Sequence, residues 1–370
     1  MQQNSGERLQ LPQLQLSGSV RQIGLAHGAA LRAQIRDFVP MRFTATLAYL
    51  RELGHTDVAP LIDIGRRCLA AHAAWHPAGH AEHVAIAEGA GVDAVELYTA
   101  ANMTDMRDVL ALGAETPGRR GPLADAEGCT AALLPAAFVA SRQVIAAQTW
   151  DLNPEDLDFV VAIRRAPDDA PATWSVTCSG CLALVGMNDR GLAVGTTNIK
   201  TWGSKVGVGY MAILHRMLAS ATFAEAAAAC QTAPRAAAHT YWLADSARLS
   251  EWETTAWSAL RRDATTAPLA RTNHCLVPQH AEKQAEAPSP SSQARLERLR
   301  DRLQSGAPHD LASLQAIFAD RSDGVDSINR FAEDGQGTST NSCVIAIPAA
   351  RTLWACRGSA DRGAWQPLRF

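Results

Sequence analysis

The residue of this sequence with the clearest chemical potential is Cys129, which lies between Gly128 and Thr130. It follows a segment rich in Gly, Pro and charge, residues 113–128, of the kind that forms exposed connections. A Gly before a nucleophile leaves the carbonyl of the Gly unshielded. It also tolerates the strained backbone that an intramolecular attack requires. A buried Cys at the start of a strand would explain the same pattern. The residues alone therefore leave a nucleophile and a core thiol both open.

Cys178 and Cys181 form a CxxC motif, which occurs in redox pairs and in zinc sites. No second CxxC or close His pair accompanies it, and the motif lies in a strand-like hairpin. We interpret the two as packed thiols, with a metal- or redox-dependent protein as the alternative. We expect no metal and no cofactor. The other cysteines have apolar neighbours and are expected in the core: Cys68, Cys230, Cys275, Cys343 and Cys356.

An ordered series of motifs resembles the acyl-coenzyme A:isopenicillin N acyltransferase (penicillin acyltransferase) family, whose members are N-terminal-nucleophile (Ntn) hydrolases that cleave themselves at a Gly-Cys bond. Their order and approximate spacing hold over nearly the whole chain. The motifs are GSVRQIGLAHG at 18–28, AIAEGA at 85–90, GCT at 128–130, AQTWD at 147–151, GMNDRGLAV at 186–194, TNHCL at 272–276 and SINR at 327–330.

The resemblance implies that the Cys129 thiol attacks the carbonyl of Gly128 and that the resulting thioester is hydrolysed. This reaction separates residues 1–128, a helical pro-segment, from residues 129–370, the Ntn-hydrolase catalytic core. The two parts would stay together as an αβ heterodimer. The freed α-amine of Cys129 has an ordinary pKa of about 8, so it can act as the base for its own thiol.

The resemblance also assigns three further catalytic residues. Asn273 would donate a side-chain N–H to the oxyanion, Asp151 would hold the α-amine, and Arg330 would pair with Asp151 or balance the charge of the site. Taken singly, an Asp at a strand end could be a turn former, an Asn could bond backbone, and an Arg could form a surface ion pair.

Supporting roles fall to Gln148, Trp150 and Asn198, which the resemblance places around the substrate. Gln148 would order the polar network, although a simple amide at a strand end is an equal alternative. His27 is expected to be a helix-packing residue, since this chemistry needs no imidazole.

The activity implied is hydrolysis or transfer of the acyl group of a small N-acyl amide, through a thioester on Cys129. The enzyme would be an amidohydrolase acting on linear C–N bonds or an N-acyltransferase. We favour hydrolysis because no coenzyme-A-binding motif is visible, while a coenzyme A thioester remains a possible donor. A binding protein that keeps the fold and never matures is a further alternative.

The elements that position these residues change character at Cys129. Apolar spacing predicts helices at 20–53, 62–74, 83–88 and 93–109. Strands are expected at 144–150, 159–164, 173–177, 182–187, 192–197, 240–244, 248–253, 271–277, 342–347 and 352–356, and helices at 208–219, 222–230, 294–304 and 310–319. This order indicates an α+β protein with antiparallel sheets. The resemblance implies a four-layer αββα sandwich with a helical N-terminal segment.

The bulk composition excludes several classes of protein. The chain has 370 residues and a formal net charge of −3, which gives no electrostatic reason to expect a nucleic acid or an anionic membrane as partner. The first residues lack the pattern of a secretory signal, and no apolar run is long enough to span a bilayer. We therefore expect a cytoplasmic protein with a small-molecule substrate.

Overall fold

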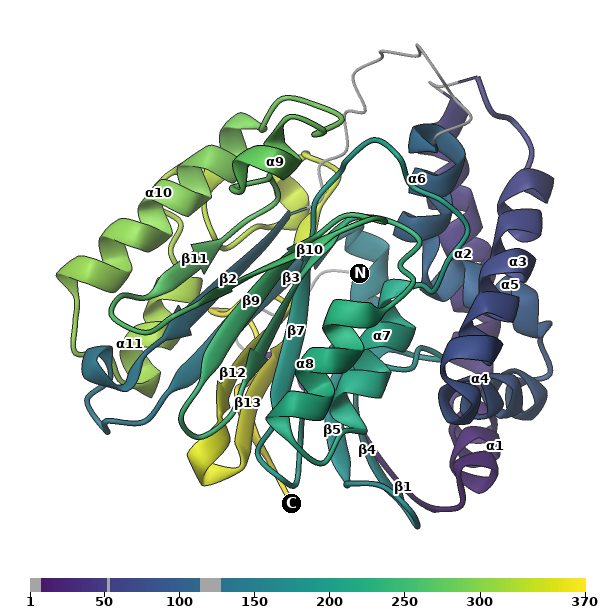
Figure 1. Ribbon diagram of the computed structural model, residues 1–370, viewed down its shortest axis with the longest axis horizontal. Helices are drawn as coiled ribbons and strands as arrows, with labels where there is room; N and C mark the ends of the chain where they lie inside the picture. The colour runs from purple at the N-terminus through teal and green to yellow at the C-terminus, as the bar shows by residue number, and fades with distance from the viewer. Residues whose placement is uncertain (1–7, 52–53, 114–127) are drawn as a thin grey trace.

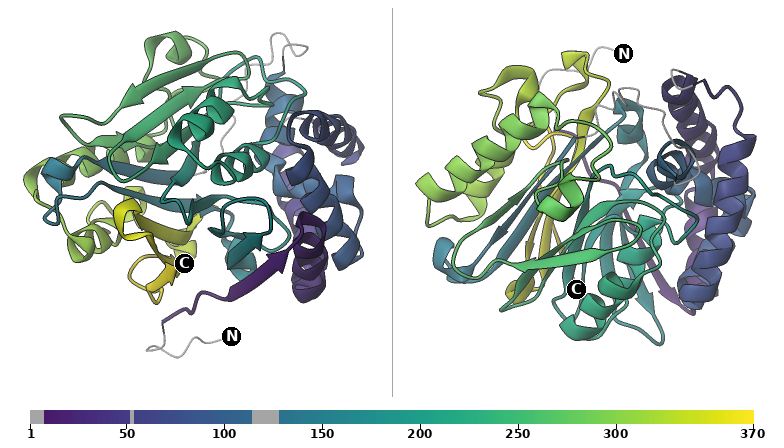
Figure 2. Two further views of the ribbon diagram at one scale, coloured as in Figure 1. Left: turned by 60° about the horizontal axis from the view of Figure 1, so that its bottom comes forward. Right: turned by 45° about the horizontal axis from the view of Figure 1, so that its top comes forward.

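The computed structural model describes residues 8–51, 54–113 and 128–370. Two β-sheets lie face to face between layers of helices (Figures 1 and 2). One sheet has eight strands in the order β1-β4-β5-β6-β7-β8-β9-β10, and the other has six in the order β11-β2-β3-β12-β13-β14. The expected α+β class and αββα sandwich are thus confirmed.

The strands of the larger sheet are β1 (Gln13–Gly18), β4 (Val160–Pro167), β5 (Thr173–Cys178), β6 (Val185–Asn188), β7 (Ala193–Asn198), β8 (His239–Ala244), β9 (Leu249–Thr254) and β10 (Ala259–Asp263). Those of the smaller sheet are β2 (Gly128–Leu134), β3 (Ile145–Leu152), β11 (Leu269–Arg271), β12 (Ser339–Ile347), β13 (Thr352–Arg357) and β14 (Gln366–Arg369). The helices are α1 (Val20–Ala30), α2 (Arg32–Arg51), α3 (Ala59–Trp75), α4 (Pro77–Ala90), α5 (Ala94–Ala101), α6 (Met103–Leu112), α7 (Tyr210–Leu218), α8 (Phe223–Thr232), α9 (Pro278–Ala281), α10 (Pro290–Ser305) and α11 (Leu311–Phe318).

Alternation along β2 explains how the smaller sheet is buried on both faces. Ala131 and Leu133 belong to the apolar cluster between the two sheets. Ala132 and Leu134 belong to a second cluster, which the apolar faces of α10 and α11 complete. Successive side chains of a strand point to opposite faces, so β2 serves both layers at once.

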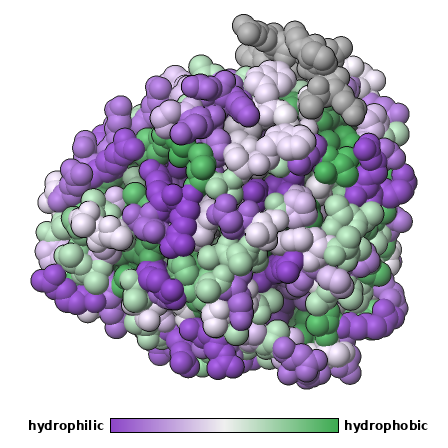
Figure 3. All heavy atoms as spheres, viewed as in Figure 1, coloured by the Kyte–Doolittle hydropathy of each residue, from purple (hydrophilic) through white to green (hydrophobic). Residues whose placement is uncertain are grey.

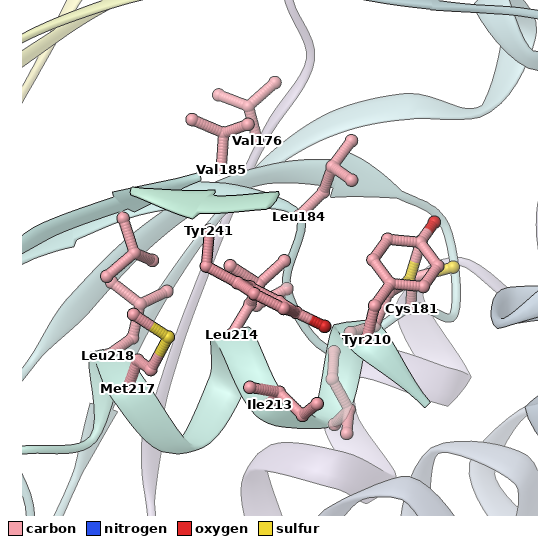
Figure 4. Close-up of a cluster of buried hydrophobic side chains, with 14 of the residues drawn as sticks. Val176, Cys181, Leu184, Val185, Tyr210, Ile213, Leu214, Met217, Leu218 and Tyr241 are labelled. Carbon is pink, nitrogen blue, oxygen red and sulfur yellow. The ribbon is translucent and has the colours of Figure 1, made fainter. Parts of the chain in front are cut away.

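Helices α7 and α8 cover the outer face of the larger sheet. Figure 4 shows the apolar side of α7, with Ile213, Leu214 and Met217, packed against the sheet residue Tyr241. The N-terminal helices extend this layer (Figure 1). Helix α1 packs closely against α4 at Gly24 and Gly28. A Cβ atom at position 28 would lie only 2.1 Å from the carbonyl oxygen of Ile86, so a larger residue would not fit there. These glycines therefore permit close contact of the two helices.

A turn at 188–191 connects β6 and β7, which pair antiparallel. Asn188 Oδ1 accepts hydrogen bonds from the backbone N–H groups of Arg190 and Leu192, at 3.0 Å each. Gly191 adopts a φ of +78°, which suits a residue without a Cβ. β12 and β13 also pair antiparallel.

The course of the chain differs from the expected one in two places. β1, for which no strand was predicted, pairs parallel with β4 and forms one edge of the larger sheet. The strand expected at 271–277 ends at Arg271. Beyond it, side chains bind the backbone donors that a neighbouring strand would otherwise satisfy: Glu253 accepts from Leu276 and Val277, and Gln284 accepts from Cys275.

The expected exposed connection before Cys129 lies largely outside the described residues. Within the described residues, no helix is long and apolar enough to cross a membrane. Figure 3 shows polar and apolar residues interleaved over the viewed face of the molecule.

Candidate active site

Cys129 lies near the start of β2, opposite Trp150 of the adjacent strand β3. Its side chain belongs to the face between the two sheets, and the residue is 5% exposed. The neighbouring pair in the same register is Gly128 with Asp151. The GCT and TWD motifs are therefore brought side by side by ordinary antiparallel pairing.

Both backbone polar groups of Cys129 are bound by side chains that are distant in the sequence. Its N–H donates to Asn273 Oδ1 at 2.8 Å. Its carbonyl oxygen accepts from Arg295 Nη1 at 2.6 Å. Arg295 Nη2 also donates to Asn273 Oδ1, at 3.0 Å, so the three residues form one network.

The contact of Asn273 differs from the expected one. Its Nδ2 donates to the carbonyl oxygen of Asn198 at 3.0 Å, whereas its Oδ1 faces the N–H of Cys129. The neighbours of Oδ1 are donors and the neighbour of Nδ2 is an acceptor, which fixes this orientation of the amide. The expected donation by Asn273 to an oxyanion stays a prediction; in this structure its Nδ2 donates to Asn198 and its Oδ1 is the atom that faces Cys129.

Arg295 is the site residue that sequence reasoning missed. It lies on α10 and is 1% exposed, on the helix face that also carries Leu296, Leu299 and Leu303. Burial, and next the positive charge of Arg330, lower the pKa of Arg295 to about 10, so the guanidinium stays charged near neutral pH. A charged residue on the apolar face of an amphipathic helix was the available signal.

Arg330 and Asp151 lie directly against Gly128. A Cβ atom at position 128 would lie 2.3 Å from Arg330 Nη1 and 3.0 Å from Asp151 Oδ2. The guanidinium of Arg330 also donates to Gln336 Oε1. If Gly128 moved away from Cys129, the space that it leaves beside the nitrogen of Cys129 would therefore be bordered by one cation and one carboxylate.

The carboxyl group of Asp151 is fully buried, and burial raises its pKa to about 6. The positive charges of Arg295 and Arg330 act in the opposite direction, as do the hydroxyls of Thr340 and Thr149. Asp151 is consequently a carboxylate at neutral pH, and mild acid neutralises it.

Gln148 connects the two sheets. Its Oε1 accepts from the backbone N–H of Thr196 at 3.0 Å and from Trp242 Nε1 at 2.6 Å, while its Nε2 donates to the carbonyl oxygen of Thr196 at 2.5 Å. These contacts tie β3 to β7 and β8. The side chain therefore acts on the fold around the site, and no contact of Gln148 with Asp151 is found among the described residues.

A small cavity of about 20 Å³ adjoins Cys129, enough space for a water molecule or two. Its lining comes from both sheets, from α6 and α7, and from the segment before β6: Thr104, Cys129, Trp150, Asp151, Leu152, Leu184, Thr196, Asn198, Tyr210 and His239. Trp150 and Asn198, expected near the substrate, thus line the same cavity as Cys129. Thr104 precedes the Gly128–Cys129 bond in sequence, so both sides of that bond contribute to the cavity.

The CxxC pair and His27 lie in packed surroundings and do not line the cavity beside Cys129. Figure 4 shows Cys181 beside the ring of Tyr210. Burial raises the pKa of the Cys181 thiol to about 12 and that of Cys178 well above its ordinary value, which disfavours the reactive thiolate. Among the described residues, no group of three or more His, Cys, Asp or Glu could hold a metal ion. His27 Nε2 accepts from the backbone N–H of Gly180 at 3.1 Å, a packing contact.

A family model described as "Acyl-coenzyme A:6-aminopenicillanic acid acyl-transferase" matches residues 140–362 of this chain. The matched span includes Asp151, Asn273 and Arg330, and begins after Cys129. No curated protein matches the sequence.

Three solved structures are similar to this chain at low sequence identity. Penicillin V acylase from Agrobacterium tumefaciens is 13% identical, with 62% of this chain and 83% of that chain covered and a TM-score of 0.42. A mutant of conjugated bile acid hydrolase from Clostridium perfringens is 11% identical, with 65% and 97% covered and a TM-score of 0.36. A second variant of that hydrolase is 12% identical, with 65% and 89% covered and a TM-score of 0.34.

Proposed function

Since this chain belongs to the acyl-coenzyme A:6-aminopenicillanic acid acyl-transferase family, we propose that it cleaves itself between Gly128 and Cys129 and then acts on small N-acyl amides through Cys129. The observation that carries the proposal is the set of contacts around Cys129. Side chains bind both its N–H and its carbonyl oxygen, and the residue lines a cavity. An ordinary strand residue would pair these groups with a neighbouring strand alone.

Maturation begins with attack of the Cys129 thiol on the carbonyl of Gly128. The C–N bond breaks as the thioester forms, the nitrogen of Cys129 takes up a proton, and water then releases the carboxylate of Gly128. The absence of a side chain at position 128 lets Arg330 Nη1 and Asp151 Oδ2 approach this residue closely. Their charges can then act near the carbonyl during attack.

In the mature enzyme the α-amine of Cys129 serves as the base for its thiol. Asn273 Oδ1, which already accepts from this nitrogen, orients the amine, and Asp151 stabilises its protonated form. Asn198 lines the cavity and has a side-chain amide, so we assign it as the donor to the oxyanion in place of Asn273.

Residues 1–128 remain part of the enzyme after cleavage in this proposal. Thr104 contributes to the cavity, and β1 supplies an edge strand of the larger sheet. Loss of residues 1–128 would open the cavity and expose the edge of β4 that β1 covers. The mature protein is therefore an αβ heterodimer of 1–128 and 129–370.

Hydrolysis is the favoured outcome of the thioester because the cavity that adjoins Cys129 is small, at about 20 Å³, and water needs no binding site of its own. Transfer to an amine, with a coenzyme A thioester as donor, is the alternative that the name of the family raises.

The test is the intact mass of the wild-type protein beside Cys129→Ala, with Cys230→Ala as the matched control at another buried Cys. We expect two fragments from the wild type and from the control, with the break at Gly128/Cys129, and one full-length chain from Cys129→Ala. An intact chain in all three would overturn the self-cleavage. Amide hydrolysis is then screened with N-acyl anilides, with and without an added amine to detect transfer.

A further inference from the structure

We refer to Thr104, Tyr210 and His239, which line the cavity beside Cys129, together with Asp105, which bonds to two of them, as the polar end of the cavity. Asp105 Oδ1 lies 2.6 Å from His239 Nε2, and Asp105 Oδ2 accepts from the backbone N–H of Tyr210 at 2.7 Å. The ring of His239 stacks on that of Tyr210, with 4.6 Å between centroids. Thr104, His239 and Tyr210 line the cavity, and Asp105 lies behind them. The imidazole is therefore held rigidly from two sides.

The bond to Asp105 determines which nitrogen of His239 carries the proton. An ionised carboxylate only accepts hydrogen bonds, so Nε2 must be the protonated nitrogen. Neutral His239 then has an acceptor lone pair at Nδ1. The Asp105 carboxylate fixes this tautomer, as acidic residues behind a functional imidazole commonly do.

Two polar atoms at this end of the cavity have no partner among the described residues. They are His239 Nδ1 and Thr104 Oγ1. The two residues are 2% and 7% exposed. Buried polar atoms are nearly always hydrogen-bonded, and an unsatisfied one is costly. Two of them on one cavity, from α6 and from β8, indicate a group that binds between them.

We propose that this polar end recognises a hydrogen-bond donor, a hydroxyl or an amine, at the far end of the substrate's acyl chain. The inference rests on the proposed function, since it takes the acyl group as the part that stays on Cys129. His239 Nδ1 accepts from the donor, and Thr104 Oγ1 supplies a second contact. Asp105 is a positioning residue that acts through His239.

The acyl side is assigned because the lining of the cavity is buried and adjoins the nucleophile. The amine product leaves before the thioester is hydrolysed, whereas the acyl group stays until the end. A buried subsite next to the thiol therefore fits the group that stays.

The test compares anilides of ω-hydroxyacyl chains with n-acyl anilides of equal length, from propanoyl to pentanoyl, using kcat/KM of the mature protein. At the best length, we expect the hydroxyl compound to be preferred at least about tenfold, because only it satisfies the buried acceptor. Equal values, or a preference for the methyl-terminated compound at every length, would overturn the inference.

Two variants locate the preference. His239→Gln can keep a donor toward Asp105 while it removes the Nδ1 acceptor, and Thr104→Val removes the hydroxyl at nearly constant volume. Each should lower the hydroxyl/methyl ratio several-fold. Thr196→Val is the matched control, since the Thr196 hydroxyl lines the same cavity and already donates to the carbonyl oxygen of Thr240 at 2.7 Å. Its ratio should match that of the wild type, and an equal fall in all three variants would refute the assignment.

A binding measurement separates this inference from the proposed function. Calorimetry with methyl ketones, in which a methyl group replaces the anilide nitrogen and its ring, reports recognition without turnover. Tighter binding of the ω-hydroxy ketone to wild type, lost in His239→Gln, would support the subsite even if no anilide were cleaved. Anilide cleavage with no preference in either measurement would leave the proposed function standing and refute the subsite.

Discussion

Asp151 has a raised pKa that makes its charge a cost to folding. Its pKa moves from 3.8 to about 6 on burial. Because the folded pKa is the higher one, the native state binds more protons between these values, and stability falls as pH rises through that window. The shift corresponds to a cost on the order of 3 kcal/mol above about pH 6.

We therefore expect Asp151→Asn to stabilise the protein near pH 8, because Asn resembles the protonated acid. The comparison is made in the Cys129→Ala background, so that neither chain can be cleaved at this site. The midpoint of thermal unfolding should rise by several degrees near pH 8, and the gain should shrink toward pH 4. In the Cys129-containing protein the same change should abolish amide cleavage. No gain in the unfolding midpoint at pH 8 would show that Asp151 is not strained by burial.

The resemblance identified Cys129, Asp151, Asn273 and Arg330, which the structure brings around one strand end. Sequence could not supply the direction of the Asn273 amide, because that depends on which donors and acceptors the fold brings to it. Nor did it identify Arg295, because an Arg on a helix is ordinarily exposed. His239 and Thr104 carry no local signal for their shared cavity, which arises only when α6 meets β8.

At the scale of elements, helix α10 places a cation against the backbone of Cys129. Arg295→Met keeps much of the buried volume and removes the donors to the Cys129 carbonyl and to Asn273. We expect self-cleavage to slow by at least about tenfold, since an uncharged side chain leaves the carbonyl unpaired and Asn273 unrestrained. The time course of fragment formation after synthesis measures this.

Arg298→Met is the control on the same helix. Arg298 bonds to Asp323 and its side chain is 31% exposed, so its replacement should leave the rate close to that of the wild type. Equal rates in wild type and Arg295→Met would contradict a role of α10 in maturation.

Periodicity predicted most elements because most lie on a packed face. The helices at 208–219 and 294–304 and the strands at 342–347 and 352–356 are found close to their expected bounds. β1 was missed although Leu14 and Leu16 alternate with glutamines there, because the stretch is polar on average. The strand predicted at 271–277 does not continue past Arg271, because the backbone N–H groups of Cys275 and Leu276 donate to the side chains of Gln284 and Glu253 and not to a neighbouring strand.

At the scale of the whole molecule, buried polar contacts join the N-terminal helices to the core. Glu82 of α4 pairs with Arg165 of β4 at 2.6 Å and lies 3.1 Å from His215 Nε2 of α7. Arg165 and these other groups are largely buried, so removal of one partner leaves an unpaired charge. In the proposed cleaved form, such contacts would hold the two parts together.

We expect Glu82→Gln to destabilise the protein by about 3 kcal/mol or more, chiefly by leaving Arg165 buried without its carboxylate. Denaturant unfolding measures this change. Glu88→Gln on the same helix is the control, because Glu88 forms an exposed ion pair with Arg21 and should change stability little. Similar effects of the two substitutions would show that the buried pair contributes no more than a surface one.

The same interface contains histidines that burial keeps neutral in the folded protein. Burial lowers the pKa of His76 to about 3 and that of His83 to about 4, and His72 and His80 beside them are also lowered. His76 Nε2 lies 3.1 Å from His215 Nδ1 of α7, with Glu82 and Arg216 close by. Because the folded pKa values lie below the ordinary 6.5, the unfolded state binds more protons below that pH. Stability is therefore full above about pH 6.5 and falls as pH drops toward 4.

For the cleaved protein, this interface predicts loss of the heterodimer in mild acid. Size-exclusion chromatography between about pH 7.5 and pH 5 should show fragments 1–128 and 129–370 separating or aggregating at the acid end, while the uncleaved Cys129→Ala chain stays a single species. His76→Gln should shift this transition to lower pH, because it removes one proton-binding group, whereas His55→Gln, outside the cluster, should not. A heterodimer equally stable at both pH values would show that these buried histidines do not control the association of its two parts.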